Sequence, residues 1–115
     1  MSFNREVKTA IEAALESGKI LRKFASKTKS VRYKGTINLV TEADKLSQEK
    51  IIRILKKGFP EYSILSEEDL YLKSNSPIKW IIDPLDGTTN FAHNLPIYSI
   101  SIALEVDGKI EMGVV

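Results

Sequence analysis

Apolar residues recur every three or four positions through the first half of the chain, which is the spacing of amphipathic helices. The first helix is predicted from about Arg5 to Ala25, and the polar, basic residues 26–37 after it predict a loop. Its expected buried positions are Val7, Ile11, Ala14, Leu15, Gly18, Leu21 and Ala25.

A second helix is expected from Thr41 to about Lys57. Thr41-Glu42-Ala43-Asp44 has the pattern of a capping box with Asp in the place of Glu. Gly58-Phe59-Pro60 is a strong helix stop. The positions predicted to be buried in this helix are Leu46, Ile51, Ile54 and Leu55.

Beyond residue 60 the pattern changes to the alternation and short apolar runs that are typical of strands. Four strands are predicted, and Asp107-Gly108 between the last two is a strong two-residue hairpin signal. The predicted strands are Tyr62–Ser66, Ile78–Ile82, Tyr98–Val106 and Lys109–Val115.

Composition limits the kinds of metal site that the chain can form and argues against a membrane protein. The 115 residues contain no cysteine, so any metal would be bound through oxygen ligands or the single histidine. No apolar run is long enough to span a membrane, and the first residues lack a secretory signal, so we expect a cytoplasmic protein without a membrane partner.

The net charge of +2 conceals an uneven distribution. Residues 1–60 carry 14 Lys or Arg against 6 Asp or Glu, whereas residues 61–115 carry 3 against 9. The basic half suits an anionic substrate or nucleic acid, and the acidic half suits a cation. The Lys- and Arg-rich segment 19–34 has only Phe24 and Tyr33 as aromatic residues that could stack on bases, and no nucleic-acid-binding motif is recognisable. Nucleic acid is therefore the less favoured partner.

The strongest chemical signal is the segment Asp83-Pro84-Leu85-Asp86-Gly87-Thr88-Thr89-Asn90-Phe91. An apolar strand here delivers two carboxylates to its carboxyl end, and Gly87 allows close approach of the backbone to a ligand. Thr88 and Thr89 are expected to open a short helix, and Mg²⁺ could bridge the carboxylates to a bound phosphate. The alternative is a turn in which Asp83 and Asp86 only accept hydrogen bonds from backbone N–H groups.

The segment Trp80–Phe91 resembles the signature of the inositol monophosphatase family. Asn38–Asp44 and Ser66-Glu67-Glu68 resemble two further motifs of that family, in the same order. The resemblance implies an α/β fold in which this chain is the N-terminal portion of a layered α/β/α/β/α sugar-phosphatase fold. Two helices would pack on a largely antiparallel sheet, and residues 1–115 would form a single incomplete domain that carries the metal-binding part.

The resemblance also implies a role for each matching residue. Glu67, Asp83, the backbone carbonyl of Leu85 and Asp86 would bind Mg²⁺, with Mn²⁺ as an alternative. Asp86, Gly87 and Thr88 would contact the substrate. Asp44, Glu67 and Thr88 would be catalytic, with Thr88 and its hydrogen-bond partner Asp44 orienting the attacking water.

The implied function is hydrolysis of inositol monophosphate or a related sugar phosphate by metal-activated water. Other substrates in the family are fructose 1,6-bisphosphate, nucleotide 3′-phosphates and histidinol phosphate, and the full-length parent is expected to be a homodimer. The family has a further aspartate ligand in its second half, which this sequence lacks. The chain alone is therefore expected to be weakly active or inactive, and a non-catalytic or partner-binding fragment is the alternative.

Overall fold

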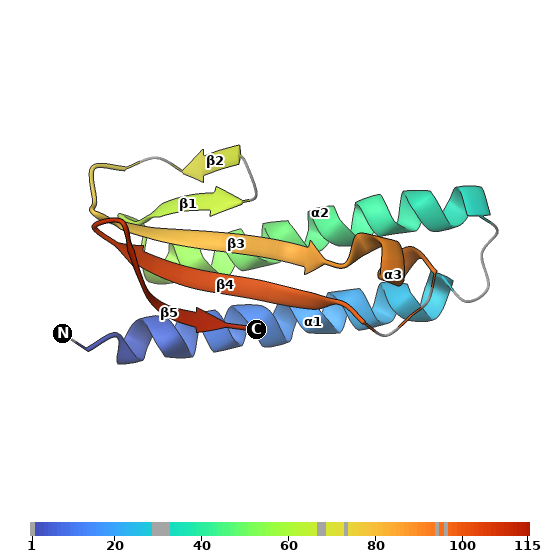
Figure 1. The fold of residues 1–115 in the computed structure, drawn as a ribbon, viewed down its shortest axis with the longest axis horizontal. Helices are drawn as coiled ribbons and strands as arrows, with labels where there is room; N and C mark the ends of the chain where they lie inside the picture. Colours follow the sequence, from blue (N-terminus) through green and yellow to red (C-terminus); the bar gives the residue numbers. More distant parts are fainter. Residues whose placement is uncertain (1, 29–32, 67–68, 73, 94, 96) are drawn as a thin grey trace.

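The computed structural model describes residues 2–28, 33–66, 69–72, 74–93, 95 and 97–115 (Figure 1). Two long helices, α1 (Asn4–Thr28) and α2 (Tyr33–Gly58), are followed by the strands and a short third helix. Gly58 ends α2, as Gly58-Phe59-Pro60 predicted. No helix among the described residues is long and apolar enough to cross a membrane.

The helices depart from the prediction between residues 26 and 37. Residues 26–28 continue α1, and α2 begins at Tyr33, so the predicted loop is wrong in both of these parts. Thr41 lies inside α2, which excludes it as a helix cap. Polar composition favours a loop only weakly, because the Lys and Arg residues of this segment are good helix formers and the segment contains no proline to interrupt a helix.

The buried face of α1 is also rotated from the predicted one. Ile11 and Leu15 are 44% and 59% exposed. The residues that α1 buries are instead Glu6, Ala10, Ala13, Ser17, Leu21 and Phe24. Small side chains among these let the helix backbone approach its neighbours closely, and α1 packs mainly on α2.

The strands form one five-stranded sheet in the order β2-β1-β3-β4-β5. Their bounds are β1 (Ser63–Ser66), β2 (Asp69–Leu72), β3 (Ile78–Asp86), β4 (Ser99–Val106) and β5 (Lys109–Val114). Only β1 and β3 are parallel, and the other neighbours are antiparallel. The α/β class and the largely antiparallel sheet are thus confirmed, while β2 was not predicted.

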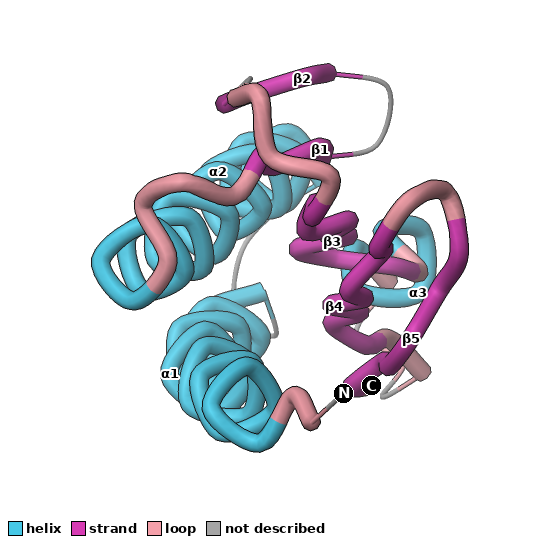
Figure 2. Tube along the Cα trace, turned by 90° about the vertical axis from the view of Figure 1, so that its left-hand side faces the viewer, coloured by secondary structure: helices cyan, strands magenta, loops and turns pink. Residues whose placement is uncertain are grey.

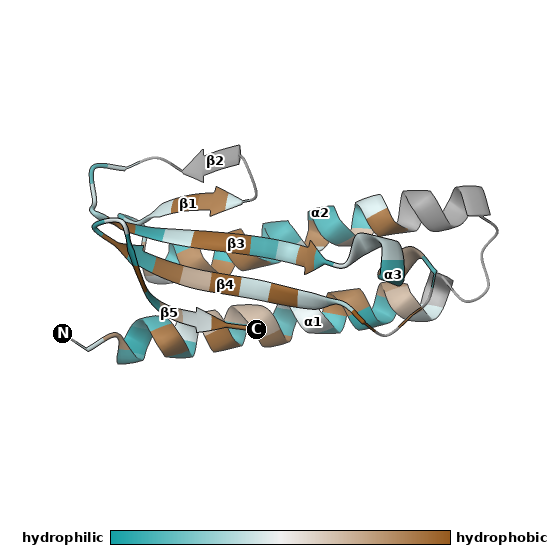
Figure 3. Ribbon diagram, in the orientation of Figure 1, coloured by the Kyte–Doolittle hydropathy of each residue, from teal (hydrophilic) through white to brown (hydrophobic). Residues whose placement is uncertain are grey.

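Both long helices cover the same face of the sheet, with α2 beside β1 and β3 and α1 beside β4 and β5 (Figure 2). Strand alternation turns Trp80 and Ile82 of β3 toward this core, and Ile81 between them is only partly buried. The same alternation buries Ile100, Ile102 and Leu104 of β4, and Figure 3 shows the apolar stretches along both strands.

An aromatic cluster closes the end of the core where β3 begins. The Phe59 and Tyr62 rings stack at 4.9 Å, and both rings lie within 6.1 Å of Trp80. The Tyr62 hydroxyl donates a 2.8 Å hydrogen bond to the buried carboxylate of Glu6 on α1. Burial and this hydrogen bond raise the pKa of Tyr62 to about 12.

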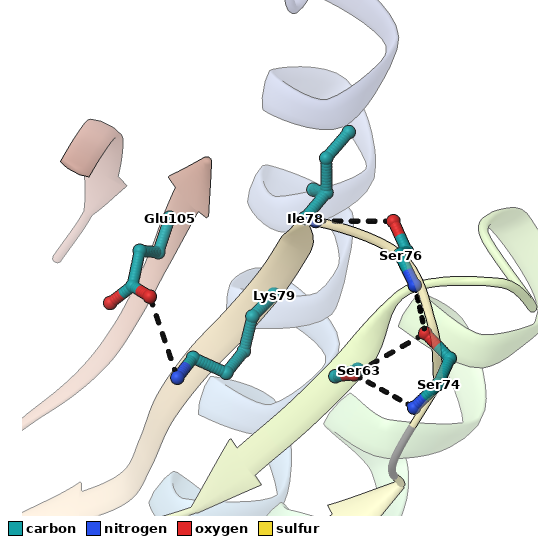
Figure 4. Close-up of polar contacts among 6 residues, drawn as sticks. All are labelled: Ser63, Ser74, Ser76, Ile78, Lys79 and Glu105. Carbon is teal, nitrogen blue, oxygen red and sulfur yellow. Dashed lines mark hydrogen bonds and ion pairs between the residues drawn. The ribbon is translucent and has the colours of Figure 1, made fainter. Parts of the chain in front are cut away.

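Serine side chains shape the connection into β3 (Figure 4). The Ser63 hydroxyl accepts a 3.0 Å hydrogen bond from the Ser74 backbone N–H, and Ser76 accepts one of 3.1 Å from the Ile78 N–H. Lys79 then pairs with Glu105 across β3 and β4 at 3.4 Å. These contacts lie at the opposite end of β3 from its two aspartates.

Candidate metal centre

The last residues of β3 leave the regular strand ladder. Asp83 pairs with Ser101 and Asp86 with Ser99, and the register shifts between them. Pro84 and Leu85 lie in this irregularity, and both are buried. Asp83 is partly buried and Asp86 is exposed. The strand therefore delivers two carboxylates to one end of the sheet.

Hydrogen bonds hold the backbone between the two aspartates. Asp83 Oδ1 accepts a 3.2 Å hydrogen bond from the Leu85 N–H, which is the bond that the capped-turn alternative requires. The Pro84 carbonyl accepts a 2.8 Å hydrogen bond from the Ser47 hydroxyl on α2. Because Asp83 Oδ2 and the carboxylate of Asp86 are not needed for this turn, the turn and a cation site are compatible.

Gly87 makes the sharp change of direction after Asp86. Its φ of 88° lies in the left-handed region, where residues with a Cβ atom are strained. A Cβ atom at this position would also lie 2.8 Å from the backbone oxygen of Ile97. The turn leads into α3 (Thr88–Ala92), as predicted, with Thr88 exposed at its first position.

Contacts with the segment before β4 hold α3 in place. Phe91 is buried and meets the Tyr98 ring edge-to-face at 4.9 Å. Asn90 Nδ2 donates a 2.8 Å hydrogen bond to the Ile97 carbonyl. His93 is exposed, and its Nδ1 lies 2.8 Å from the Thr89 carbonyl oxygen, which gives this histidine a structural contact.

Asp44 lies on α2, a different element from the strand that carries Asp83 and Asp86. Asp44 is partly buried on α2, one helical turn before Ser47, which contacts Pro84. Glu67 lies outside the described residues. The preceding residue, Ser66, ends β1 and is paired with Ile82, the residue before Asp83, in the parallel ladder.

The donor atoms suit a hard divalent cation. The two carboxylates and the Leu85 carbonyl supply only oxygen ligands, which Mg²⁺ prefers. Within the described part of the chain neither Asp83 nor Asp86 is in an ion pair. Among all the residues that the structure describes, no group of three His, Cys, Asp or Glu side chains is placed to hold a metal. The predicted convergence of Glu67 with Asp83 and Asp86 therefore stays a prediction.

Three polar residues next to the site were given no role in the sequence interpretation. They are Ser47, Gln48 and Ser66, and the Ser66 hydroxyl donates a 2.7 Å hydrogen bond to Gln48 Oε1. A signal was present, because Ser47 falls between Ala43 and Ile51 on the apolar stripe of α2. A hydroxyl at a core-facing helix position must find a partner, and here the partner is the backbone of β3.

Comparison with known proteins gives a consistent match. Residues 4–115 match the model of the Inositol monophosphatase family. The chain is 42% identical over 116 residues to Nus factor SuhB from Pasteurella multocida, covering 98% of this chain and 43% of that protein. It is 41% identical over 118 residues to Inositol monophosphatase 3 from Solanum lycopersicum, covering 99% and 44%.

A solved structure agrees with these sequence matches. The crystal structure of the extragenic suppressor protein suhB from Bartonella henselae superposes with a TM-score of 0.84 at 33% identity. The match covers 96% of this chain and 42% of that one. The chain thus spans less than half the length of the relatives that it matches.

Proposed function

Because the chain belongs to the inositol monophosphatase family, we propose that it carries the N-terminal metal-binding part of a Mg²⁺-dependent phosphomonoesterase. The substrate is inositol monophosphate or a related sugar phosphate. The observation that supports this most is the delivery of Asp83 and Asp86 by one strand into the left-handed turn at Gly87, directly before α3.

Each residue has a part in this proposal. Glu67, Asp83, Asp86 and the Leu85 carbonyl hold the cations, with Mn²⁺ as an alternative to Mg²⁺. The backbone N–H groups of Gly87 and Thr88 hold the phosphate, and Asp86 faces the substrate hydroxyl. Gly87 suits this task for two reasons. It has no side chain to shield its backbone N–H, and it adopts the left-handed φ of this turn without strain.

Water is the nucleophile in the proposed reaction. The Thr88 hydroxyl, with Asp44 as its partner, orients the water for attack on phosphorus in line with the leaving alkoxide. When bound, Mg²⁺ would lower the pKa of that water and neutralise the negative charge of the leaving alkoxide. No covalent phosphoenzyme forms in this scheme, and one phosphate and one alcohol are released per water consumed.

A full activity requires more than these residues. The family resemblance places another aspartate ligand in a second half that this chain does not contain. Misplacing reacting groups by about 1 Å costs roughly a hundredfold in rate. We therefore propose weak or absent activity for residues 1–115 alone, and a cytoplasmic, homodimeric enzyme for a chain of the relatives' length.

The test measures phosphate release with and without Mg²⁺ from four substrates: inositol 1-phosphate, fructose 1,6-bisphosphate, a nucleotide 3′-phosphate and histidinol phosphate. It compares residues 1–115 with a version extended to the relatives' length. In the extended version Asp83→Asn should abolish release, whereas Asp107→Asn, a change in the β4–β5 turn, should not. Absence of Mg²⁺-dependent release from all four substrates by the extended version would overturn the proposal.

A second candidate is binding of another macromolecule without catalysis. It is favoured by the 42% identity to a protein named Nus factor SuhB and by the exposed basic residues Lys19, Arg22 and Lys23 of α1. A binding role of this face would persist in Asp83→Asn and disappear when the three basic residues are replaced by Gln, which separates it from the enzyme.

A further inference from the structure

One peptide group in the candidate site is held at both of its ends. The carbonyl of Pro84 and the N–H of Leu85 belong to the same planar unit and point in opposite directions. The carbonyl accepts the hydrogen bond of Ser47, and the N–H donates to Asp83 Oδ1. The orientation of this plane is thus defined by one side chain from α2 and one from the candidate metal ligands.

Ser47 reaches the peptide from inside the core. It is fully buried on α2, and its own carbonyl accepts a 3.2 Å hydrogen bond from the buried hydroxyl of Ser17 on α1. A chain of hydrogen bonds therefore runs from α1 through α2 to β3. At this depth water has no access, so loss of the Ser47 hydroxyl would leave the Pro84 carbonyl without a donor.

The irregular strand makes this contact necessary. The register shift between Asp83 and Asp86 removes Pro84 and Leu85 from the paired positions of the β3–β4 ladder. The peptide between them must take its hydrogen bonds from side chains instead. If the peptide plane rotates, the Leu85 N–H leaves Asp83 Oδ1, and both the carboxylate and the following Leu85 carbonyl lose their orientation.

The residue next to Ser47 holds the neighbouring strand. Gln48 Oε1 accepts the hydrogen bond of Ser66, the last residue of β1, directly before Glu67 in the sequence. Ser66 pairs with Ile82 in the parallel ladder. Two consecutive residues of α2 therefore contact the carboxyl-terminal parts of the neighbouring strands β1 and β3, close in sequence to the predicted carboxylate ligands.

We propose that Ser47 is a positioning residue: through the Pro84–Leu85 peptide it orients Asp83 and the Leu85 carbonyl toward a divalent cation. This inference rests on the proposed function for the identity of the ligands. It assigns the fully buried hydroxyl a purpose beyond core packing, since its hydrogen bond joins α2 to the backbone between the two aspartates.

The experiment compares Ser47→Ala with Ser63→Ala in the 115-residue chain. Ser63 is a suitable control because it is also buried and hydrogen-bonded. It is the first residue of β1, at the end of the strand away from Ser66 and the candidate site (Figure 4). The first readout is amide hydrogen exchange at Leu85 without metal. Exchange should become about five- to tenfold faster in Ser47→Ala and stay unchanged in Ser63→Ala, because one buried hydrogen bond is worth about that factor.

The second readout is the Kd for Mn²⁺, measured by electron paramagnetic resonance, together with urea unfolding. Ser47→Ala should raise the Kd about five- to tenfold, the effect of losing one positioning hydrogen bond. Ser63→Ala should lower stability without changing the Kd. If Ser47→Ala does not fold, Ser47→Cys takes its place, since a thiol is only a weak donor.

Equal Leu85 exchange and equal Mn²⁺ affinity in the Ser47 and Ser63 variants would overturn the positioning role. Asp83→Asn separates this failure from failure of the proposed function. If Asp83→Asn weakens Mn²⁺ binding but Ser47→Ala behaves as Ser63→Ala does, only the positioning role is wrong. If Asp83→Asn leaves Mn²⁺ binding unchanged, the ligand assignment itself is wrong, and with it the positioning role.

Discussion

Replacing Gly87 by alanine should destabilise the chain far more than the same change at Gly108. Both glycines have positive φ, 88° and 80° respectively, so each alanine variant is strained in its backbone. This strain costs about 1–2 kcal/mol for a residue with a Cβ atom. Apart from Gly108 itself and its two chain neighbours, no described residue has an atom within 4 Å of the added Cβ, so strain is the whole effect.

At Gly87 a steric cost is added to the strain. The new Cβ would lie 2.8 Å from the Ile97 oxygen and 3.3 Å from the Tyr98 Cα, and both of these are backbone atoms that cannot rotate away. Overpacking of this kind typically costs about 1–3 kcal/mol. The expected loss of unfolding free energy is thus about 2–5 kcal/mol for Gly87→Ala and about 1–2 kcal/mol for Gly108→Ala.

Urea unfolding followed by tryptophan fluorescence measures both losses, because Trp80 is the single, fully buried tryptophan. The Mn²⁺ Kd of each variant, measured at a urea concentration where it stays folded, adds a local readout. Gly87→Ala should weaken Mn²⁺ binding and Gly108→Ala should not. Equal losses of stability in the two variants would refute the close approach of Gly87 to the segment before β4.

Two further predictions concern the aromatic cluster. The pKa of Tyr62 is raised to about 12 in the folded chain, so the unfolded chain loses this proton first and the free energy of unfolding should fall as pH rises from about 10 to 12. In urea unfolding, Tyr62→Phe should remove about 1–3 kcal/mol of that fall. An unchanged dependence of stability on pH would contradict the Tyr62–Glu6 contact. Trp80 Nε1 has no hydrogen-bond partner among the described residues. Trp80→Phe keeps most of the ring volume and loses no hydrogen bond, so it should cost clearly less than the ~3–5 kcal/mol expected for Trp80→Ala. Equal losses in urea unfolding would contradict this reasoning.

Local signals in the sequence were sufficient for much of the fold. Asp107-Gly108 predicted the β4–β5 hairpin, and both residues have the positive φ that such a turn requires. Gly58 marked the end of α2. Alternation predicted the strand at Tyr98–Val106, and β4 buries Ile100, Ile102 and Leu104 on one face, because successive side chains of a strand point to opposite sides.

The prediction of the buried face of α1 was wrong because tertiary contacts, and not local sequence, determine which face is buried. α1 carries apolar residues around more than half of its circumference, so periodicity alone could not choose between the face with Ile11 and Leu15 and the face with Ala10 and Ala13. Close packing on α2 favours the smaller side chains.

In the candidate site, too, the local features could be predicted from the sequence and the long-range contacts could not. The carboxylates Asp83 and Asp86, the turn at Gly87 and the start of α3 are consecutive in sequence and could be predicted from a motif. The contact of Ser47 with Pro84 joins residues 37 positions apart. Its geometry depends on how α2 lies against β3, which no local pattern specifies.

The location of a bound cation tests the central claim most directly. In a Mn²⁺ titration followed by amide NMR, paramagnetic broadening falls steeply with distance from the ion. The signals of residues 83, 85, 86, 87 and 88 should broaden first, and those of Asp107 and Gly108 in the distant hairpin should broaden last. Asp83→Asn should require a higher Mn²⁺ concentration for the same effect. Broadening that is uniform, or that begins at the hairpin, would contradict a metal site at the end of β3.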